Sequence, residues 1–331
     1  EKFVDKYFER EVYPVLTPMA VDSSRPFPLI SNRTLNIGAL IRDKKKDVID
    51  IATVQVPSVL ARVVELPPEG DVREIILLEE IIEKNLNKLF LNYEIVCAHP
   101  YRIMRNADLA IDEDDAADLL KEIEKQIKKR AWGEVIKLEV EADMDKRLLK
   151  ELKKQLQVSG EAVYLINGPL DLTFLSKVRG LDGFDHLKGK KYIPQPVPEL
   201  NCEENIFEQI KKKDILLHHP YYEFTPVIEF IKQAAKDPDV LAIKQTLYRV
   251  SGNSPIVAAL ALAAENGKQV TVLVELKARF DEENNINWAK KLEKAGCHVI
   301  YGLVGLKTHS KIALVVRREE DGIKRYVHLG T

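Results

Sequence analysis

The feature that most constrains the fold is a regular alternation of apolar strand-like and helix-like segments in the second half of the 331-residue chain. Aliphatic and β-branched runs predict strands at residues 214–217, 240–248, 270–276 and 299–301. Segments with helical spacing separate them at 226–236, 256–265 and 283–294, and a hairpin of 311–317 with 324–329 follows. Apolar strands that alternate with helices indicate a mainly parallel sheet covered on both faces. We therefore predict an α/β domain over residues 196–331.

The first region, residues 1–195, has a different pattern and is predicted to be an α+β domain. Strand-like runs occur at 12–21, 34–41, 50–64, 95–105, 136–142 and 162–166. Two helices are expected, at 73–91 and 112–130. The second begins with acidic residues and ends with basic ones, as the helix dipole favours, and its charges indicate a solvated helix more than a partner-binding face. A proline-rich stretch at 194–198 marks the expected domain boundary.

The composition limits the classes of partner and compartment. The net charge is −2, so the chain has no global field that would attract nucleic acid, and any anion site must be local. Cys97, Cys202 and Cys297 are far apart in the sequence and suit a reducing compartment. The longest apolar run, 255–264, is too short to span a bilayer. We expect a cytoplasmic protein, either free or peripheral to the inner face of the membrane.

Both ends of the sequence have the character of cut ends. The chain opens with a stretch of helical character and no initiator Met, and it stops just after the strand-like residues 326–329. These features predict that the sequence is an excised fragment of a larger protein.

Charged residues gather where two of the predicted strands end, which is where ligands bind in sheets of this kind. Arg249 follows the strand at 240–248. On the next strand along the chain, Glu275, Lys277 and Arg279 would share one face. A buried salt-bridge network of Lys244, Glu275 and Lys277 would explain part of this row without any ligand. The two arginines differ, because a guanidinium at a strand exit can bind two phosphate oxygens at once.

The motif GLKTHSK at residues 305–311 contains the histidine with the strongest functional signal. Side chains alternate along a strand, so His309 and Lys311 should point to the same side. An imidazole nucleophile beside an ammonium group can attack phosphorus and hold its oxygens, and Arg249 and Arg279 would complete a polyanion site. The other six histidines fit packing roles or have no partner readable from the sequence. The triplet alone leaves the catalytic role of His309 open.

Several motifs resemble, in the same order along the chain, those of bacterial polyphosphate kinase of the type that works through a phosphohistidine. In the second region they are AIKQTLYRV (242–250), VELKARFDE (274–282), NWAK (287–290) and GLKTHSK (305–311). In the first region they are YPVLTP (13–18) and RIMRNAD (102–108). The likeness covers essentially the whole chain. The first region is similar to the head domain of the family, and residues 196–331 resemble one half of the phospholipase D fold.

The resemblance implies reversible transfer of the γ-phosphoryl group of ATP to polyphosphate, with Mg²⁺ as cofactor and with ATP, ADP and inorganic polyphosphate as partners. The phosphorylated histidine of the family falls on His309, with Lys311 beside it. The arginines at the family's Mg²⁺-phosphate site fall on Arg249 and Arg279. They would grip phosphate oxygens that themselves hold the Mg²⁺, because a guanidinium has no acceptor for a cation. The head domain would support a homo-oligomer.

Two alternatives stay open. A phospholipase D-like phosphodiesterase or nuclease would also use a histidine nucleophile, but Val316 stands where the H-x-K-x-x-x-x-D signature has its aspartate. A non-catalytic polyanion-binding module is the other alternative, and the H-x-K triplet with its two strand-end arginines argues against it. The family also carries a further H-x-K-type domain and an amino-terminal helical domain, so the fragment is expected to be inactive alone. Which group orients the imidazole of His309 stays open.

Overall fold

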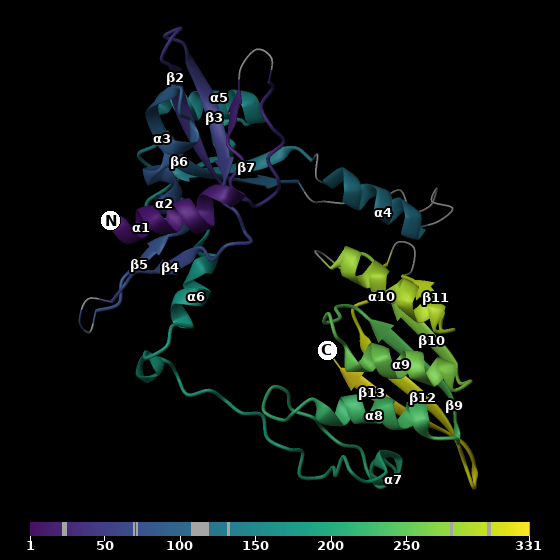
Figure 1. Ribbon diagram of the computed structural model, residues 1–331. Helices are drawn as coiled ribbons and strands as arrows, with labels where there is room; N and C mark the ends of the chain where they lie inside the picture. Colours follow the sequence, from purple (N-terminus) through teal and green to yellow (C-terminus); the bar gives the residue numbers. More distant parts are fainter. Residues whose placement is uncertain are drawn as a thin grey trace. The chain divides into compact units, whose positions relative to one another are not determined.

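The computed structural model describes residues 1–21, 25–68, 70, 72–106, 119–130, 133–278, 281–302 and 306–330. The chain forms two compact units, Glu1–Asp108 with Lys129–Gly189 and Leu109–Lys128 with Lys190–Thr331 (Figure 1). Helices and strands are combined in both units, which confirms the expected α/β class. None of the helices in these described ranges is long and apolar enough to cross a membrane.

The first unit is built on a six-stranded sheet. Its strands, in spatial order, are β1 (Met19–Val21), β3 (Ile49–Gln55), β2 (Leu35–Asp43), β6 (Tyr93–Arg105), β7 (Val135–Glu141) and β8 (Val163–Ile166). All neighbours are antiparallel except β7 and β8, which are parallel. A short antiparallel pair, β4 (Val63–Glu65) and β5 (Ile75–Leu77), forms a separate ladder. The predicted strand at 50–64 is therefore divided between β3 and β4.

The helices of the first unit depart from the sequence prediction. The helix predicted at 73–91 begins as β5 and is then divided into α2 (Leu78–Lys84) and α3 (Leu86–Leu89). Asn85 separates these two helices, and its buried side-chain amide donates to the carbonyl of Ile81 (2.9 Å). The strand predicted at 12–21 is helical at first and extended only in β1, since Pro14 lies in the first turn of a 3₁₀ helix.

The described part of the first unit contains three further α-helices. They are α1 (Lys2–Tyr7), α5 (Lys146–Leu156) and α6 (Leu175–Arg179). The sequence prediction omits α5, although its buried leucines recur every four residues and Asp145 caps its first turn by accepting from the amide of Arg147 (2.8 Å).

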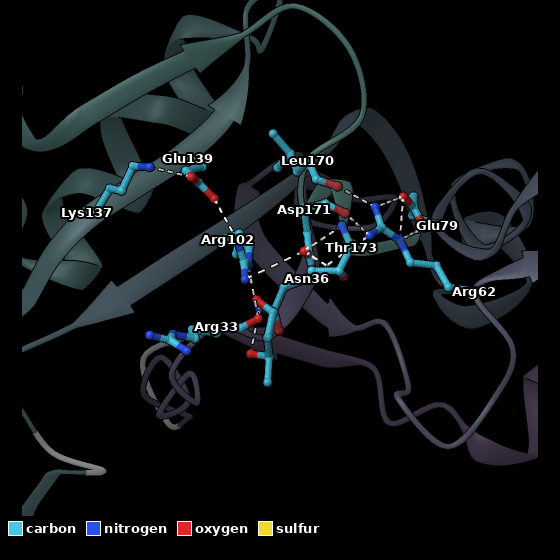
Figure 2. A network of polar contacts seen from close by, with 11 residues as sticks. Arg33, Asn36, Arg62, Glu79, Arg102, Lys137, Glu139, Leu170, Asp171 and Thr173 are labelled. Atoms are coloured by element: carbon cyan, nitrogen blue, oxygen red, sulfur yellow. Dashed lines mark hydrogen bonds and ion pairs between the residues drawn. The ribbon is translucent and has the colours of Figure 1, made fainter. Parts of the chain in front are cut away.

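An arginine–carboxylate network ties the loop at residues 167–173 to the rest of the first unit (Figure 2). The guanidinium of Arg62 contacts the carboxylate of Glu79, with Nη2 2.6 Å from Oε1, and donates to two carbonyls of this loop. Arg102 on β6 lies 3.8 Å from the carboxylate of Asp171. Because these charges are paired within the unit, we assign the network to its architecture rather than to a ligand site.

The second unit is built on a five-stranded sheet. Its strands, in spatial order, are β11 (His298–Tyr301), β10 (Gln269–Val274), β9 (Val240–Leu247), β12 (Lys311–Glu319) and β13 (Gly322–Gly330). β9, β10 and β11 are parallel, whereas β12 is antiparallel to both β9 and β13. The sheet is therefore parallel where helices connect its strands and antiparallel at the hairpin. The strand predicted at 214–217 is irregular chain.

Helices cover one face of this sheet. α8 (Thr225–Lys236), α9 (Pro255–Glu265) and α10 (Glu282–Lys294) pack side by side in that order, with the short α7 (Ile206–Ile210) next to α8 (Figure 1). The covered face carries Val272 and Val274, which are fully buried. On the opposite face Leu273 is half-buried and Val327 is exposed. The expected helices on both faces are therefore not found within the described ranges.

A helix from the middle of the chain, α4 (Leu119–Arg130), belongs to the second unit up to Lys128. Ile123 is fully buried in the core of this unit, and partly buried apolar residues three positions before it and four after it pack there too. Glu124 lies 2.5 Å from Lys290 of α10. The helix predicted at 112–130 is thus anchored by an apolar face rather than solvated all round. Residues 112–118 lie outside the described residues.

Candidate active site

The carboxyl end of β9 lies beside the amino end of β12, because the two strands are antiparallel neighbours. The hydroxyl of Thr246 joins them: it donates to the carbonyl of Ser310 (2.7 Å) and accepts from the amide of Ile312 (2.9 Å). The segment that contains His309 and leads into β12 is therefore held at the end of β9.

The ring of Tyr248, just past the end of β9, contacts four side chains of the candidate site. The imidazole of His309 lies 4.7 Å from it between ring centroids, at an interplanar angle of 77°. Lys311 places Nζ 4.7 Å from the ring centroid, Lys307 places Nζ at 5.8 Å, and Arg249 places Cζ at 5.6 Å. An exposed imidazole and three cationic side chains thus surround one aromatic ring. Such a set of groups can bind an anion with several negatively charged oxygens.

Arg249 is held on this rim by a carboxylate. Its Nε donates to Oδ2 of Asp281 (2.8 Å), and the side chains are 57% and 35% exposed. Asp281 is the N-cap residue of α10, so it is fixed to the start of that helix. One edge of the guanidinium is therefore oriented by the protein while the side chain stays accessible to a ligand from solvent.

A buried polar layer beneath the rim ties three segments together. The carboxylate of Glu275, which is fully buried, accepts from the backbone amides of Thr308 (2.6 Å) and Lys277 (3.0 Å). The side-chain amide of Asn285, also fully buried, donates to the carbonyls of Tyr248 (2.6 Å) and Glu275 (2.9 Å). The chain after β9, the turn after β10 and the segment of His309 are thereby fixed to one another.

The predicted salt-bridge network at these strand ends is wrong. β10 ends at Val274, so Glu275 and Lys277 lie in a turn rather than in one row along a strand. Lys244 is exposed on β9. Two backbone N–H groups bind the buried carboxylate, because the chain turns at this point and presents its amides.

Three of the four side chains predicted to form the site come together. His309, Lys311 and Arg249 all lie around the Tyr248 ring, whereas Arg279 lies outside the described residues. β12 begins at Lys311, so His309 lies before the strand. The alternation of side chains along a strand therefore does not explain why His309 and Lys311 lie near each other. Sequence reasoning missed Tyr248, because a tyrosine next to Arg249 carries no signal until the ring's neighbours are known.

The carboxylates near this site suit a metal ion that is held mainly by the phosphate oxygens of a bound substrate. Two described carboxylates contact the residues around Tyr248, and both have partners: Asp281 binds Arg249, and Glu275 binds backbone amides. Mg²⁺ often takes one or two carboxylates and completes its shell with water and substrate phosphates. The residues present therefore fit Mg²⁺ only if phosphate oxygens and water supply most of its ligands.

Two family models match the chain. A model described as "Polyphosphate kinase middle domain" matches residues 1–178, and one described as "Polyphosphate kinase C-terminal domain 1" matches residues 205–331.

Individual relatives agree with these models. The polyphosphate kinase of Halalkalibacterium halodurans is 58% identical over 333 residues, which are 99% of this chain and 47% of the relative. That of Bacillus cereus is 53% identical over 339 residues, 100% of this chain and 48% of the relative. A crystal structure of polyphosphate kinase from Porphyromonas gingivalis aligns with a TM-score of 0.73 and 27% identity, over 96% of this chain and 46% of that one. The chain thus spans about half the length of the curated relatives it matches.

Proposed function

Because the chain belongs to the polyphosphate kinase family, we propose that it carries part of the active site of an enzyme that transfers the γ-phosphoryl group of ATP reversibly to polyphosphate. The observation that carries this proposal is the meeting of His309, Lys311 and Arg249 around one ring. His309 would be the group that is phosphorylated. The cations would bind the oxygens of the transferring group.

In the first step the neutral imidazole of His309 attacks the γ-phosphorus of ATP in line. A nitrogen–phosphorus bond forms, and the bond to the bridging oxygen breaks, so that ADP leaves with the electron pair. Charge spreads over the three equatorial oxygens, where Lys311 and Arg249 stabilise it, together with Arg279. In the second step a terminal oxygen of polyphosphate attacks the phosphohistidine and regenerates the imidazole.

Mg²⁺, when bound through phosphate oxygens, supplies positive charge that offsets the negative charge of the nucleotide and of the transferring group. Arg249, positioned by Asp281, would grip the same phosphate oxygens, and Arg279 is proposed to do so as well. The arginines therefore act at the metal-phosphate site without ligating the metal.

The remaining assignments follow the family. Residues 1–195 would be a head domain that supports a homo-oligomer, and residues 196–331 would be the phospholipase D-like catalytic domain. The partners would be ATP, ADP and inorganic polyphosphate, and the compartment would be the cytoplasm. Since relatives are about twice as long, we expect the 331-residue chain alone to be inactive.

Labelling with γ-³²P-ATP tests the proposal in the full-length protein that contains this chain. We expect an acid-labile, base-stable label in the unaltered protein and none in His309→Ala. His298→Ala, which removes an exposed histidine of β11 in the same unit, is the matched control and should label normally. A label that persists in His309→Ala would refute the assignment. Cleavage of bis(p-nitrophenyl) phosphate without any label would favour the phosphodiesterase alternative.

A further inference from the structure

We propose that Tyr248 is a positioning residue for phosphoryl transfer, which orients the imidazole of His309 and keeps the phosphate-binding cations close together before the substrate arrives. This inference rests on the function proposed above. It assigns a role to a side chain that does not itself react.

The backbone that carries the Tyr248 ring is anchored on both sides. Its carbonyl accepts from the buried side-chain amide of Asn285 (2.6 Å), and the carbonyl of Val250 accepts from the side-chain amide of Asn284 (2.7 Å). The carbonyl of Leu247, the preceding residue, accepts from the amide of Glu275 (2.9 Å). α10 and the turn after β10 therefore hold the chain in place at the ring. Because its backbone is fixed, the Tyr248 ring can hold the side chains that contact it in defined positions.

The ring contact is what orients the imidazole. Within the described part of the chain, the His309 ring has no hydrogen-bond partner, and its neighbour is the Tyr248 ring at 4.7 Å and 77°. This is the edge-to-face arrangement that aromatic pairs favour. A nucleophilic nitrogen must point along one line at phosphorus, so a ring that restricts the plane of the imidazole raises the fraction of productive orientations.

The same ring lowers the cost of gathering like charges. Lys311, Lys307 and Arg249 all place their cationic groups within 6 Å of the ring centroid, where the negative π face attracts them. Asp281 also holds Arg249, and Lys311 also donates to the backbone carbonyl of His309. Without the ring, the three neighbouring cations would repel one another and keep these positions less well. With the ring in place, the three cationic groups already lie close to where phosphate oxygens would bind. Less reorganisation is therefore needed when charge develops in the transition state.

Tyr248→Leu and Tyr248→Phe in the full-length protein test the proposal. The readout is the single-turnover rate constant of phosphohistidine formation at saturating γ-³²P-ATP. We expect Tyr248→Leu to lower it at least about tenfold, which corresponds to about 1.4 kcal/mol. Tyr248→Phe keeps the ring and should stay within about threefold of the unaltered protein. The ATP concentration at half-saturation should rise by a smaller factor than the rate constant falls, because the main effect is on orientation. The midpoint of thermal unfolding should change little.

A matched control exists in the same unit. Tyr221 makes a similar edge-on contact with His218, at 4.7 Å and 62°, and Tyr221→Leu should leave the rate constant unchanged. If Tyr248→Leu does not fold, Tyr248→Met takes its place, because methionine has no ring and its flexible side chain adapts to irregular gaps.

Two outcomes would overturn the proposal while leaving the proposed function intact. One is a Tyr248→Leu protein that labels His309 at the normal rate. The other is a Tyr248→Phe protein as slow as Tyr248→Leu, which would assign the effect to the hydroxyl. Label that persists in His309→Ala would instead refute the proposed function, so the two failures can be told apart.

Discussion

Replacing Glu275 by glutamine tests how the second unit holds the segment of His309. Each oxygen of this fully buried carboxylate accepts one backbone N–H, from Thr308 (2.6 Å) and from Lys277 (3.0 Å). Glutamine keeps the shape but offers a single oxygen. Its NH₂ group must therefore face one of the two N–H donors, and that donor loses its acceptor.

The magnitude follows from these two bonds. An N–H that loses its acceptor at this part-buried site costs about 1–3 kcal/mol, and the remaining bond changes from a charged to a neutral acceptor, which removes about 1 kcal/mol more. We expect Glu275→Gln to lower the free energy of unfolding of the second unit by about 2–4 kcal/mol. Because Thr308 directly precedes His309, phosphohistidine formation in the full-length protein should slow as well.

Tryptophan fluorescence gives an assay that is specific to this unit. Trp288 lies on α10, and Trp132 is the other tryptophan of the chain. In a Trp132→Phe variant of the 331-residue chain, Trp288 is the single tryptophan, so its emission during urea denaturation reports on the second unit. Glu283→Gln changes an exposed carboxylate of the same helix and should cost less than about 0.5 kcal/mol. If Glu275→Gln costs no more than this control, the carboxylate does not hold the segment and the reasoning fails.

Three further predictions concern other contacts. Arg249→Lys keeps the charge but loses the Nε–H that donates to Asp281 and the planar fork that can bind two phosphate oxygens. Phosphohistidine formation should therefore fall by about tenfold or more, and a normal rate would contradict this. Ile123→Ala should lower the unfolding free energy of the second unit by about 2–4 kcal/mol in the urea assay, since it empties a fully buried site; no change would mean that α4 is not anchored there. Burial, with nearby carboxylates such as Glu141, raises the pKa of Glu83 from 4.5 to about 8. The folded state then holds a proton that the unfolded chain releases, so stability should fall as pH rises from about 4.5 to about 8, and thermal melts of Glu83→Gln should show a smaller fall.

The elements with the strongest periodic pattern could be predicted from the sequence, and the failures have local causes. β9, α9 and β10 agree with the predicted segments to within two residues at each end, because each is apolar and bounded by turn residues. The helix predicted at 73–91 fails at Asn85, whose side chain bonds to the backbone, and the strand predicted at 12–21 fails at Pro14. A pattern averaged over many residues does not weigh one residue that competes for a backbone group, as Asn85 does, or that fixes its own φ angle, as Pro14 does.

For the candidate site, the amino-acid sequence sufficed to nominate His309, Lys311 and Arg249, because residue type, position near strand ends and the shared motifs are all local properties. Their meeting was decided by the tertiary structure. β12 pairs with β9 and not with β11, its neighbour along the chain, and this strand order brings the segment of His309 to the ring of Tyr248. Which strands pair depends on packing across the whole sheet, so no local pattern could reveal that an aromatic ring stands at the centre of these charges.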